Sequence, residues 1–215
     1  MQGRIALEQP RSLDEMRALL DGFAADREGF PDATVRRRRG LAKDIIEEYE
    51  PLYRLARELE GFASARLTAE SLSGPDAIIQ LNDGSGVTVQ ITTAGETAST
   101  ALQRELLAQG EPVFTNQHAS RLLPSKRTVA HGRALTSKRQ STERMIEEVK
   151  AAIQRKASAY RSGTDYLLIL IRQSSLSMET NWTTRLSEAL SNVVFAPYSA
   201  VYVTNTKTCV RCAGA

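Results

Sequence analysis

The sequence predicts an α/β (α+β) protein in which helices flank a mixed central sheet. Short apolar segments, some alternating and one continuous, are typical of strands. Longer segments repeat apolar residues every three or four positions, as amphipathic helices do. Three strands come first and later ones are separated by helices, so we expect antiparallel pairs followed by parallel ones. The 215 residues, 41% of them hydrophobic, suffice for one sizeable core.

The N-terminal segment, residues 1–40, is expected to be a helical appendage followed by a basic linker. Ser12 and Glu15 have the spacing of a capping box and precede an apolar stripe, which predicts a helix over residues 12–25. Residues 29–40 are expected to form a loop because they contain a proline, a glycine at each end and four consecutive arginines.

The core is expected to span residues 41–204 and to begin with a long helix over 41–59. Pro51 should kink this helix or split it in two, because proline lacks a backbone donor and crowds the preceding turn. Gly61 should end it. Three strands should follow, the last two joined by a turn at residues 83–85, and we expect them at residues 63–68, 76–82 and 87–93.

The second half of the chain alternates helices and strands, which gives the order α-β-β-β-α-α-β-α-β. Residues 97–109 and 141–161 have helical periodicity. Residues 111–140 lack it and are expected to be a long basic loop, which makes them a candidate functional segment. A continuous apolar segment at 166–172 predicts a strand buried on both faces. A short helix, a last strand and a tail should complete the chain at residues 183–192, 199–204 and 205–215.

Positive charge is concentrated between residues 121 and 161, where eleven basic residues accompany three acidic ones, although the whole chain carries only +3. Such an asymmetry suits a phosphate backbone, so nucleic acid is the expected partner, with DNA favoured. A solvated loop and helix face is the alternative reading. The residues expected to contact nucleic acid are Arg104, Lys126, Arg127, Arg133, Lys138 and Arg139.

Further features concern location and redox state. No apolar segment approaches the ~20 residues of a membrane span and no signal-peptide pattern begins the chain, so we expect a cytoplasmic protein without membrane contact. Cys209 and Cys212 have C-x-x-C spacing, but a structural zinc site needs four ligands and the two histidines lie far upstream. We interpret both cysteines as reduced thiols. The sequence leaves a homodimer open.

The segment Ser73–Thr93 carries the residues with the clearest chemical potential. Side chains alternate across a strand, so Thr88, Gln90 and Thr92 share one face while Val87, Val89 and Ile91 share the other. Asp76 begins the neighbouring strand. An acid at the start of one strand and two polar side chains on the next can converge on a metal ion. A turn in which Asp76 caps local amides is the alternative.

These residues and this order of elements resemble the PD-(D/E)XK, or restriction-endonuclease-like, nuclease superfamily over about residues 41–204. The segments EEYEPLYRLA, PDAIIQL, VQIT, LQRELLAQGEPV and AIQRKASAY followed by YLLILI also resemble uncharacterised bacterial and mobile-element proteins within it. The resemblance implies a restriction-endonuclease-like mixed sheet flanked by helices. It also implies a Mg²⁺ or Mn²⁺ ion held by acids on the first helix and on the second and third strands, beside a lysine.

By position, Asp76 takes the place of the acid on the second strand, and Gln90 that of the acid on the third. Thr92 takes the place of the lysine, and Glu48 on the first helix is the remaining acid. The chain departs from the family's pattern at two of these positions. Gln90 is neutral, which weakens Mg²⁺ binding, and Thr92 supplies no cation, so the site should be slow or inactive unless another base replaces the lysine.

Lys156 is the expected replacement, because it lies on the apolar line of the helix at 141–161, where an ammonium group is costly without a charged partner. It would reach Asp76 or a bound phosphate; extension past the sheet edge is the alternative. Arg104 is a weaker candidate for the same role. The leading hypothesis is a metal-dependent nuclease that hydrolyses phosphodiester bonds in DNA with Glu48, Asp76, Gln90 and Lys156. The alternatives are an inactive relative that binds nucleic acid and a protein-interaction module.

Overall fold

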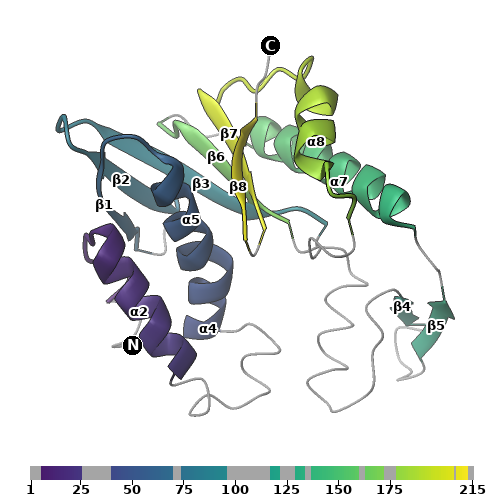
Figure 1. The fold of residues 1–215 in the computed structure, drawn as a ribbon, viewed down its shortest axis with the longest axis horizontal. Coiled ribbons are helices and arrows are strands. Elements are labelled where there is room, and N and C mark those ends of the chain that lie inside the picture. Colours follow the sequence, from purple (N-terminus) through teal and green to yellow (C-terminus); the bar gives the residue numbers. More distant parts are fainter. Residues whose placement is uncertain are drawn as a thin grey trace.

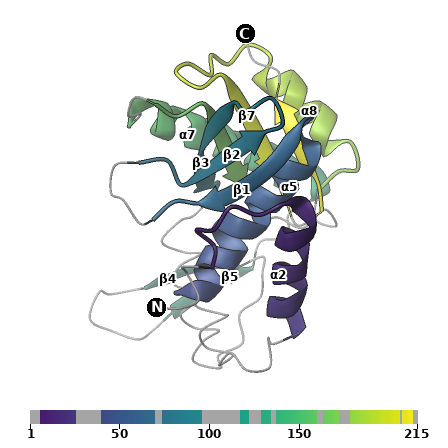
Figure 2. The ribbon, with the colours of Figure 1, turned by 90° about the vertical axis from the view of Figure 1, so that its left-hand side faces the viewer.

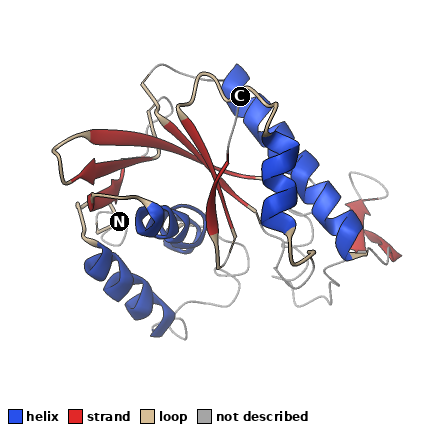
Figure 3. Ribbon diagram, turned by 45° about the horizontal axis from the view of Figure 1, so that its top comes forward, coloured by secondary structure: helices blue, strands red, loops and turns tan. Residues whose placement is uncertain are grey.

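A mixed six-stranded sheet with helices on both faces forms the body of the protein, as the sequence predicts (Figures 1 and 3). The strand order is β1-β2-β3-β6-β7-β8, and β4 and β5 form a separate two-stranded sheet. In this computed structural model the described residues are 6–25, 40–69, 74–95, 117–121, 129–133, 137–159, 163–171, 178–205 and 207–212.

The first two helical segments pack side by side on one face of the sheet (Figures 1 and 2). Helix α2 spans Leu13–Ala25, as predicted. Its first turn carries the expected capping box, because the Ser12 N–H donates to the Glu15 carboxylate at 2.8 Å. Leu7 and Met16 are buried in the same apolar cluster as the first core helix, so this N-terminal part contributes to the core.

The long helix is continuous from Leu41 to Glu58, but it changes its winding before Pro51. It consists of α4 (Leu41–Lys43), a π-helical segment η2 (Asp44–Tyr49) and α5 (Glu50–Glu58). The Glu50 N–H donates to the Ile45 carbonyl, five residues back. Proline removes a donor and its ring crowds the preceding turn, and a wider turn accommodates both effects. The expected interruption at Pro51 therefore takes the form of a π segment.

The three predicted strands form an antiparallel meander. They are β1 (Phe62–Leu67), β2 (Ala77–Leu81) and β3 (Gly86–Thr93). Leu67 pairs with Ala77 and Ala77 with Val89, so these three apolar side chains form one buried row. The turn between β2 and β3 is closed by Gly84, at φ 85°, and by Asp83, whose carboxylate accepts from the Ser85 N–H at 2.8 Å.

Two strands of the second half of the sheet run parallel to β3. Strand β6 (Tyr166–Leu170) pairs with β3, and β7 (Ala200–Thr204) pairs with β6 in the same direction. Helices α7 (Lys138–Ser158) and α8 (Trp182–Leu190) precede these strands and pack together on the opposite face from α5. Trp182 is buried at the start of α8.

Two apolar clusters, one on each face, hold the layers together. We call the sheet face under α2 and α5 the α5 face, and the opposite one the α7 face. The α5-face cluster includes Tyr49, Leu52, Leu55, Val89, Ile91, Leu168 and Tyr202. The α7-face cluster includes Val149, Ile153, Leu167, Ile169, Trp182, Val201 and Val203. Both clusters use β6, which explains its continuous hydrophobicity.

A strand that the sequence analysis missed closes the sheet. The predicted tail contains β8 (Cys209–Cys212), which pairs antiparallel with β7. A buried arginine on α5 holds the turn before it: Arg54 donates to the Asn205 carbonyl at 2.5 Å and forms an ion pair with Glu50. With only four residues, β8 lacks the length that makes a strand pattern readable in sequence.

The segment between β3 and α7 differs in part from its prediction. Residues 111–140 were expected to be loop, but Gln117–Arg121 (β4) and Val129–Arg133 (β5) form an antiparallel hairpin, and α7 begins at Lys138. The hairpin lies beyond the start of α7, apart from the main sheet (Figures 1 and 3). The helix expected at 97–109 lies outside the described residues. Of the helices that are described, none is long and apolar enough to cross a membrane.

The position of β8 predicts that its two cysteine thiols react slowly in the native protein. Cys209 belongs to the α5-face cluster and Cys212 to the α7-face cluster, and burial raises the pKa of each thiol to about 12. Because the thiolate is the reactive form, we expect a thiol reagent such as DTNB to label neither cysteine in the native protein at pH 8 and both after denaturation. Val194→Cys, at a site that is 66% exposed, is the control and should react at once. Rapid labelling of the native wild type would contradict this placement.

Candidate active site

Asp76 and Gln90 meet on the α7 face of the sheet, as the sequence analysis predicts. The amide nitrogen of Gln90 donates to Oδ2 of Asp76 at 2.7 Å. The backbone N–H of Ile91 donates to the same oxygen at 2.6 Å. Both side chains are half-buried. The Asp76 carboxylate is thus fixed against β3 by one side-chain donor and one backbone donor.

The pleat of the meander explains why these two side chains converge. Ala77 and Val89 are partners and point into the α5-face cluster, so the residues on their outer sides, Asp76 and Gln90, point to the α7 face. Asp76 is tied to its neighbours on both sides: its N–H donates to the Val89 carbonyl at 2.9 Å, and its carbonyl accepts from the Thr68 N–H at 3.0 Å. The alternative reading, a turn in which Asp76 caps only local amides, is therefore wrong.

Two oxygens of this pair are left for another ligand. Within the described part of the chain, neither Oδ1 of Asp76 nor Oε1 of Gln90 accepts a hydrogen bond from the protein. A carboxylate oxygen and an amide oxygen are both ligands that Mg²⁺ accepts. The same part of the chain contains no group of three or more histidine, cysteine, aspartate or glutamate side chains arranged around a metal position. Asp76 and Gln90 would therefore supply only two protein ligands to a metal ion.

Glu48 lies on a helical segment that packs against the opposite face of the sheet from Asp76 and Gln90. It lies half-buried on η2, whose Ile45 and Tyr49 pack on the α5 face with Val89 and Ile91. Gln90 projects from the other face of β3. Two other acids of η2, Asp44 and Glu47, are more deeply buried than Glu48, at 7% and 8% exposure. The role of Glu48 as a third ligand stays a prediction.

The lysine position holds Thr92, and the role of Lys156 as its replacement stays a prediction. Among the described residues, the Lys156 ammonium group forms no ion pair with Asp76 or another acid. Its backbone carbonyl accepts from the Tyr198 hydroxyl at 3.3 Å. Tyr198 precedes β7, which lies on the far side of β6 from β3. The base that α7 places against β3 is Arg155, whose guanidinium donates to the Thr93 carbonyl at 3.4 Å.

Three of the six basic residues of α7 are paired with acids of the same helix. Each of the three acids between residues 121 and 161 pairs with a base of α7: Glu143 with Arg139 at 2.9 Å, Glu148 with Arg144 at 2.9 Å, and Glu147 with Lys150 at 3.0 Å. Exposed pairs at this spacing contribute little stability, but they cancel charge. The surplus positive charge therefore belongs to the residues outside these pairs.

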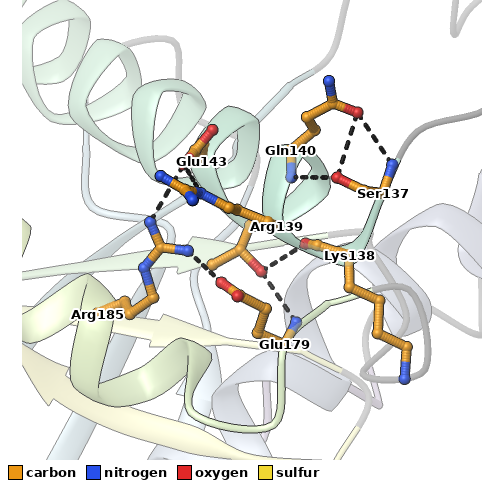
Figure 4. A network of polar contacts seen from close by, with 8 residues as sticks. Ser137, Lys138, Arg139, Gln140, Glu143, Glu179 and Arg185 are labelled. Carbon is orange, nitrogen blue, oxygen red and sulfur yellow. Dashed lines mark hydrogen bonds and ion pairs between the residues drawn. The ribbon is translucent and has the colours of Figure 1, made fainter.

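One of these pairs belongs to a network that joins α7 to α8 (Figure 4). Arg185 of α8 contacts Glu143 at 3.4 Å and forms an ion pair with Glu179. Arg139 and Arg185 lower the pKa of Glu143, the hydrogen bond from Arg139 contributing most. Arg139, which the sequence analysis expects to contact nucleic acid, belongs to this network, whereas the side chain of Lys138 points away from it (Figure 4).

The other residues expected to contact nucleic acid are only partly described. Arg104, Lys126 and Arg127 lie outside the described residues. Arg133 is the last residue of β5, where only the backbone is described. Their contacts with nucleic acid stay predictions.

Sequence reasoning missed a basic residue, Arg66, on the same sheet face as Asp76. Arg66 of β1 is half-buried and lies opposite Ile78, which in turn lies opposite Thr88. This row adjoins the row of Thr68, Asp76 and Gln90. The available signal was strand alternation: Ala65 and Leu67 are apolar, so the residue between them must face the other way.

Comparisons with known proteins do not place this chain in a family. No protein-family model matches it, and searches of curated proteins and of solved structures found no match.

A substitution just after β3 tests whether Glu148 of α7 packs against the end of this strand. Gly95 follows β3 at φ 71°, and a Cβ atom there would overlap the carboxylate of Glu148. We expect Gly95→Ala to lower the free energy of unfolding by about 1–3 kcal/mol, from backbone strain and this overlap. Chemical denaturation measures the change. In a Glu148→Ala background the loss should be smaller.

Gly22 is the matched control for this substitution. It lies inside α2 with nothing within 4 Å of a built Cβ, so Gly22→Ala should stabilise the protein by about 0.5–1 kcal/mol. Equal effects of the two substitutions would contradict both the left-handed backbone at Gly95 and the position of Glu148 against it.

Proposed function

We propose that this protein is a metal-dependent nuclease of restriction-endonuclease-like architecture that hydrolyses phosphodiester bonds in DNA through a degenerate PD-(D/E)XK site. The observation that carries the proposal is the meeting of Asp76 and Gln90 on one sheet face. No described residue donates a hydrogen bond to Oδ1 of Asp76 or to Oε1 of Gln90, so each oxygen can accept a further ligand. These two residues occupy the positions of the acids on the second and third strands.

The order of elements supports the architecture. A helix precedes an antiparallel meander, and a helical crossover then leads to a strand parallel to the third strand. These described elements agree with part of the order that the resemblance implies for residues 41–204; the helix expected at 97–109 lies outside them, and β4 and β5 are additional. The sheet has helices on both faces, and the candidate site lies on the α7 face of the meander.

Asp76 and Gln90 would hold Mg²⁺ or Mn²⁺ through Oδ1 and Oε1. When bound, such an ion lowers the pKa of a coordinated water and stabilises the charge that develops on the phosphate. The chain's own contribution is positional: Ile91 and Gln90 fix the carboxylate, so its second oxygen is held in one direction. With one carboxylate and one amide, the metal affinity should be weak.

A second candidate function is nucleic-acid binding without catalysis. Thr92 stands at the lysine position, and Lys156 forms no ion pair among the described residues that would bring it to Asp76. Without a cation beside the metal, transition-state charge is less stabilised. An inactive relative would keep the fold and the basic segment around residues 117–138.

Plasmid nicking separates the two candidates. We expect slow nicking that requires Mg²⁺ or Mn²⁺ and is lost in Asp76→Ala and Asp76→Asn, with metal binding by calorimetry lost in parallel. Thermal melts of both variants must first establish folding, because Asp76→Ala leaves the Ile91 N–H without its acceptor. Nicking that persists in both folded variants would exclude Asp76 from the chemistry.

Restoring the motif gives a gain-of-function test. The Gln90→Glu and Thr92→Lys double variant should raise the nicking rate about 10²-fold, the order of magnitude attributed to one well-placed charge-stabilising group. Gln80→Lys is the control for the added lysine, since it places one positive charge at an exposed position on the same sheet face, whereas the double variant leaves the net charge unchanged. If the wild type binds DNA and neither the wild type nor the double variant nicks it, the inactive relative is favoured.

A further inference from the structure

We propose that Arg66 of β1 binds a backbone phosphate of the nucleic acid at the Asp76 site, and so supplies the cation that Thr92 lacks. The inference rests on the function proposed above. It concerns a residue outside the positions that the resemblance assigns.

The register of the meander places Arg66 beside Asp76. Leu67 pairs with Ala77, and the Thr68 N–H donates to the Asp76 carbonyl, so Thr68 lies opposite Asp76. Arg66 is two residues from Thr68 along β1 and therefore on the same face. Diagonal neighbours of this kind have backbones about 7–8 Å apart, a span that long side chains bridge.

Within the described part of the chain, the guanidinium of Arg66 has no protein partner. It forms no ion pair and no side-chain hydrogen bond with those residues, although its side chain is half-buried. In particular, no ion pair joins Arg66 to Asp76, whose Oδ2 accepts from Gln90 and Ile91. Ile78 and Thr88, which share its row, carry no charge.

This arrangement puts a cation and an acid side by side without joining them. Arginine binds phosphate oxygens through two parallel N–H donors, and half-burial strengthens the interaction by reducing screening by water. A phosphate held by Arg66 would lie over the row of Asp76 and Gln90. The sheet face thus offers a positive group for the substrate and an oxygen pair for the metal.

Anisotropy of a fluorescein-labelled 20-base-pair DNA duplex, measured in EDTA and in Ca²⁺ without turnover, tests the inference. We expect Arg66→Ala to weaken binding about ten-fold at roughly 0.1 M salt and to reduce the slope of log affinity against log salt by about one. Arg66→Lys should retain part of the affinity, since it keeps the charge but loses the two-donor geometry.

Arg57→Ala is the matched control. Arg57 is exposed on α5, over the ring of Tyr53 and on the opposite side of the sheet, so its removal changes net charge equally. It should alter the affinity less than two-fold. Thermal melts must show that each variant is folded before affinities are compared.

The outcomes for Arg66 and for the proposed nuclease are separable. Unchanged DNA affinity in Arg66→Ala overturns the inference, even if Asp76-dependent nicking is found. Arg66-dependent binding with no nicking leaves the inference standing and overturns the nuclease. Equal losses in Arg66→Ala and Arg57→Ala also overturn the inference, because net charge alone would then explain the effect.

Discussion

The parallel pairing of β3 with β6 is the constraint on which the rest of the structure depends. It joins the antiparallel meander to the half of the sheet built by helical crossovers, in a register that runs from Val89 with Tyr166 to Thr93 with Leu170. Each end is pinned. Thr88 and Asp165 exchange backbone and carboxylate hydrogen bonds at one end, and the Ala94 N–H donates to the Leu170 carbonyl at the other. Side-chain alternation makes a one-residue slip intolerable, because it would turn Gln90 into the α5-face core.

The register also explains the electrostatics of the candidate site. An acid at position 90 would place a second negative charge within hydrogen-bond distance of Asp76, and such a pair requires a cation to stay ionised. Glutamine removes this requirement, because its amide donates to the carboxylate directly. The pair is therefore stable without metal, at the cost of the charge that would bind metal tightly. Conformational order and metal affinity are opposed at this one position.

The sequence predicted most of the fold, and its errors have identifiable physical causes. The meander, the buried strand β6 and the core helices follow from strong periodicity, and the structure confirms them. The π segment was foreseeable only as an interruption at Pro51, because the sequence does not say how a helix accommodates proline. Strand β8 is too short for a pattern, and β4 and β5 lack the alternation that marks a half-buried strand. The meeting of Asp76 and Gln90 followed from alternation alone, whereas the ion pair that joins α7 to α8 through Arg185 and the position of Lys156 depend on tertiary contacts.

Strand β8 has a consequence for how the two layers are coupled. Its four residues are the last to join the sheet, yet one cysteine enters each apolar cluster. An extended chain advances about 3.3 Å per residue, so two cysteines three residues apart lie roughly 10 Å from one another, beyond the reach of a disulfide. The reactivity of Cys209 therefore reports the opening of the α5 layer, and that of Cys212 the opening of the α7 layer. Exposure of one thiol before the other would show that the layers open separately, and simultaneous exposure would show one cooperative unit.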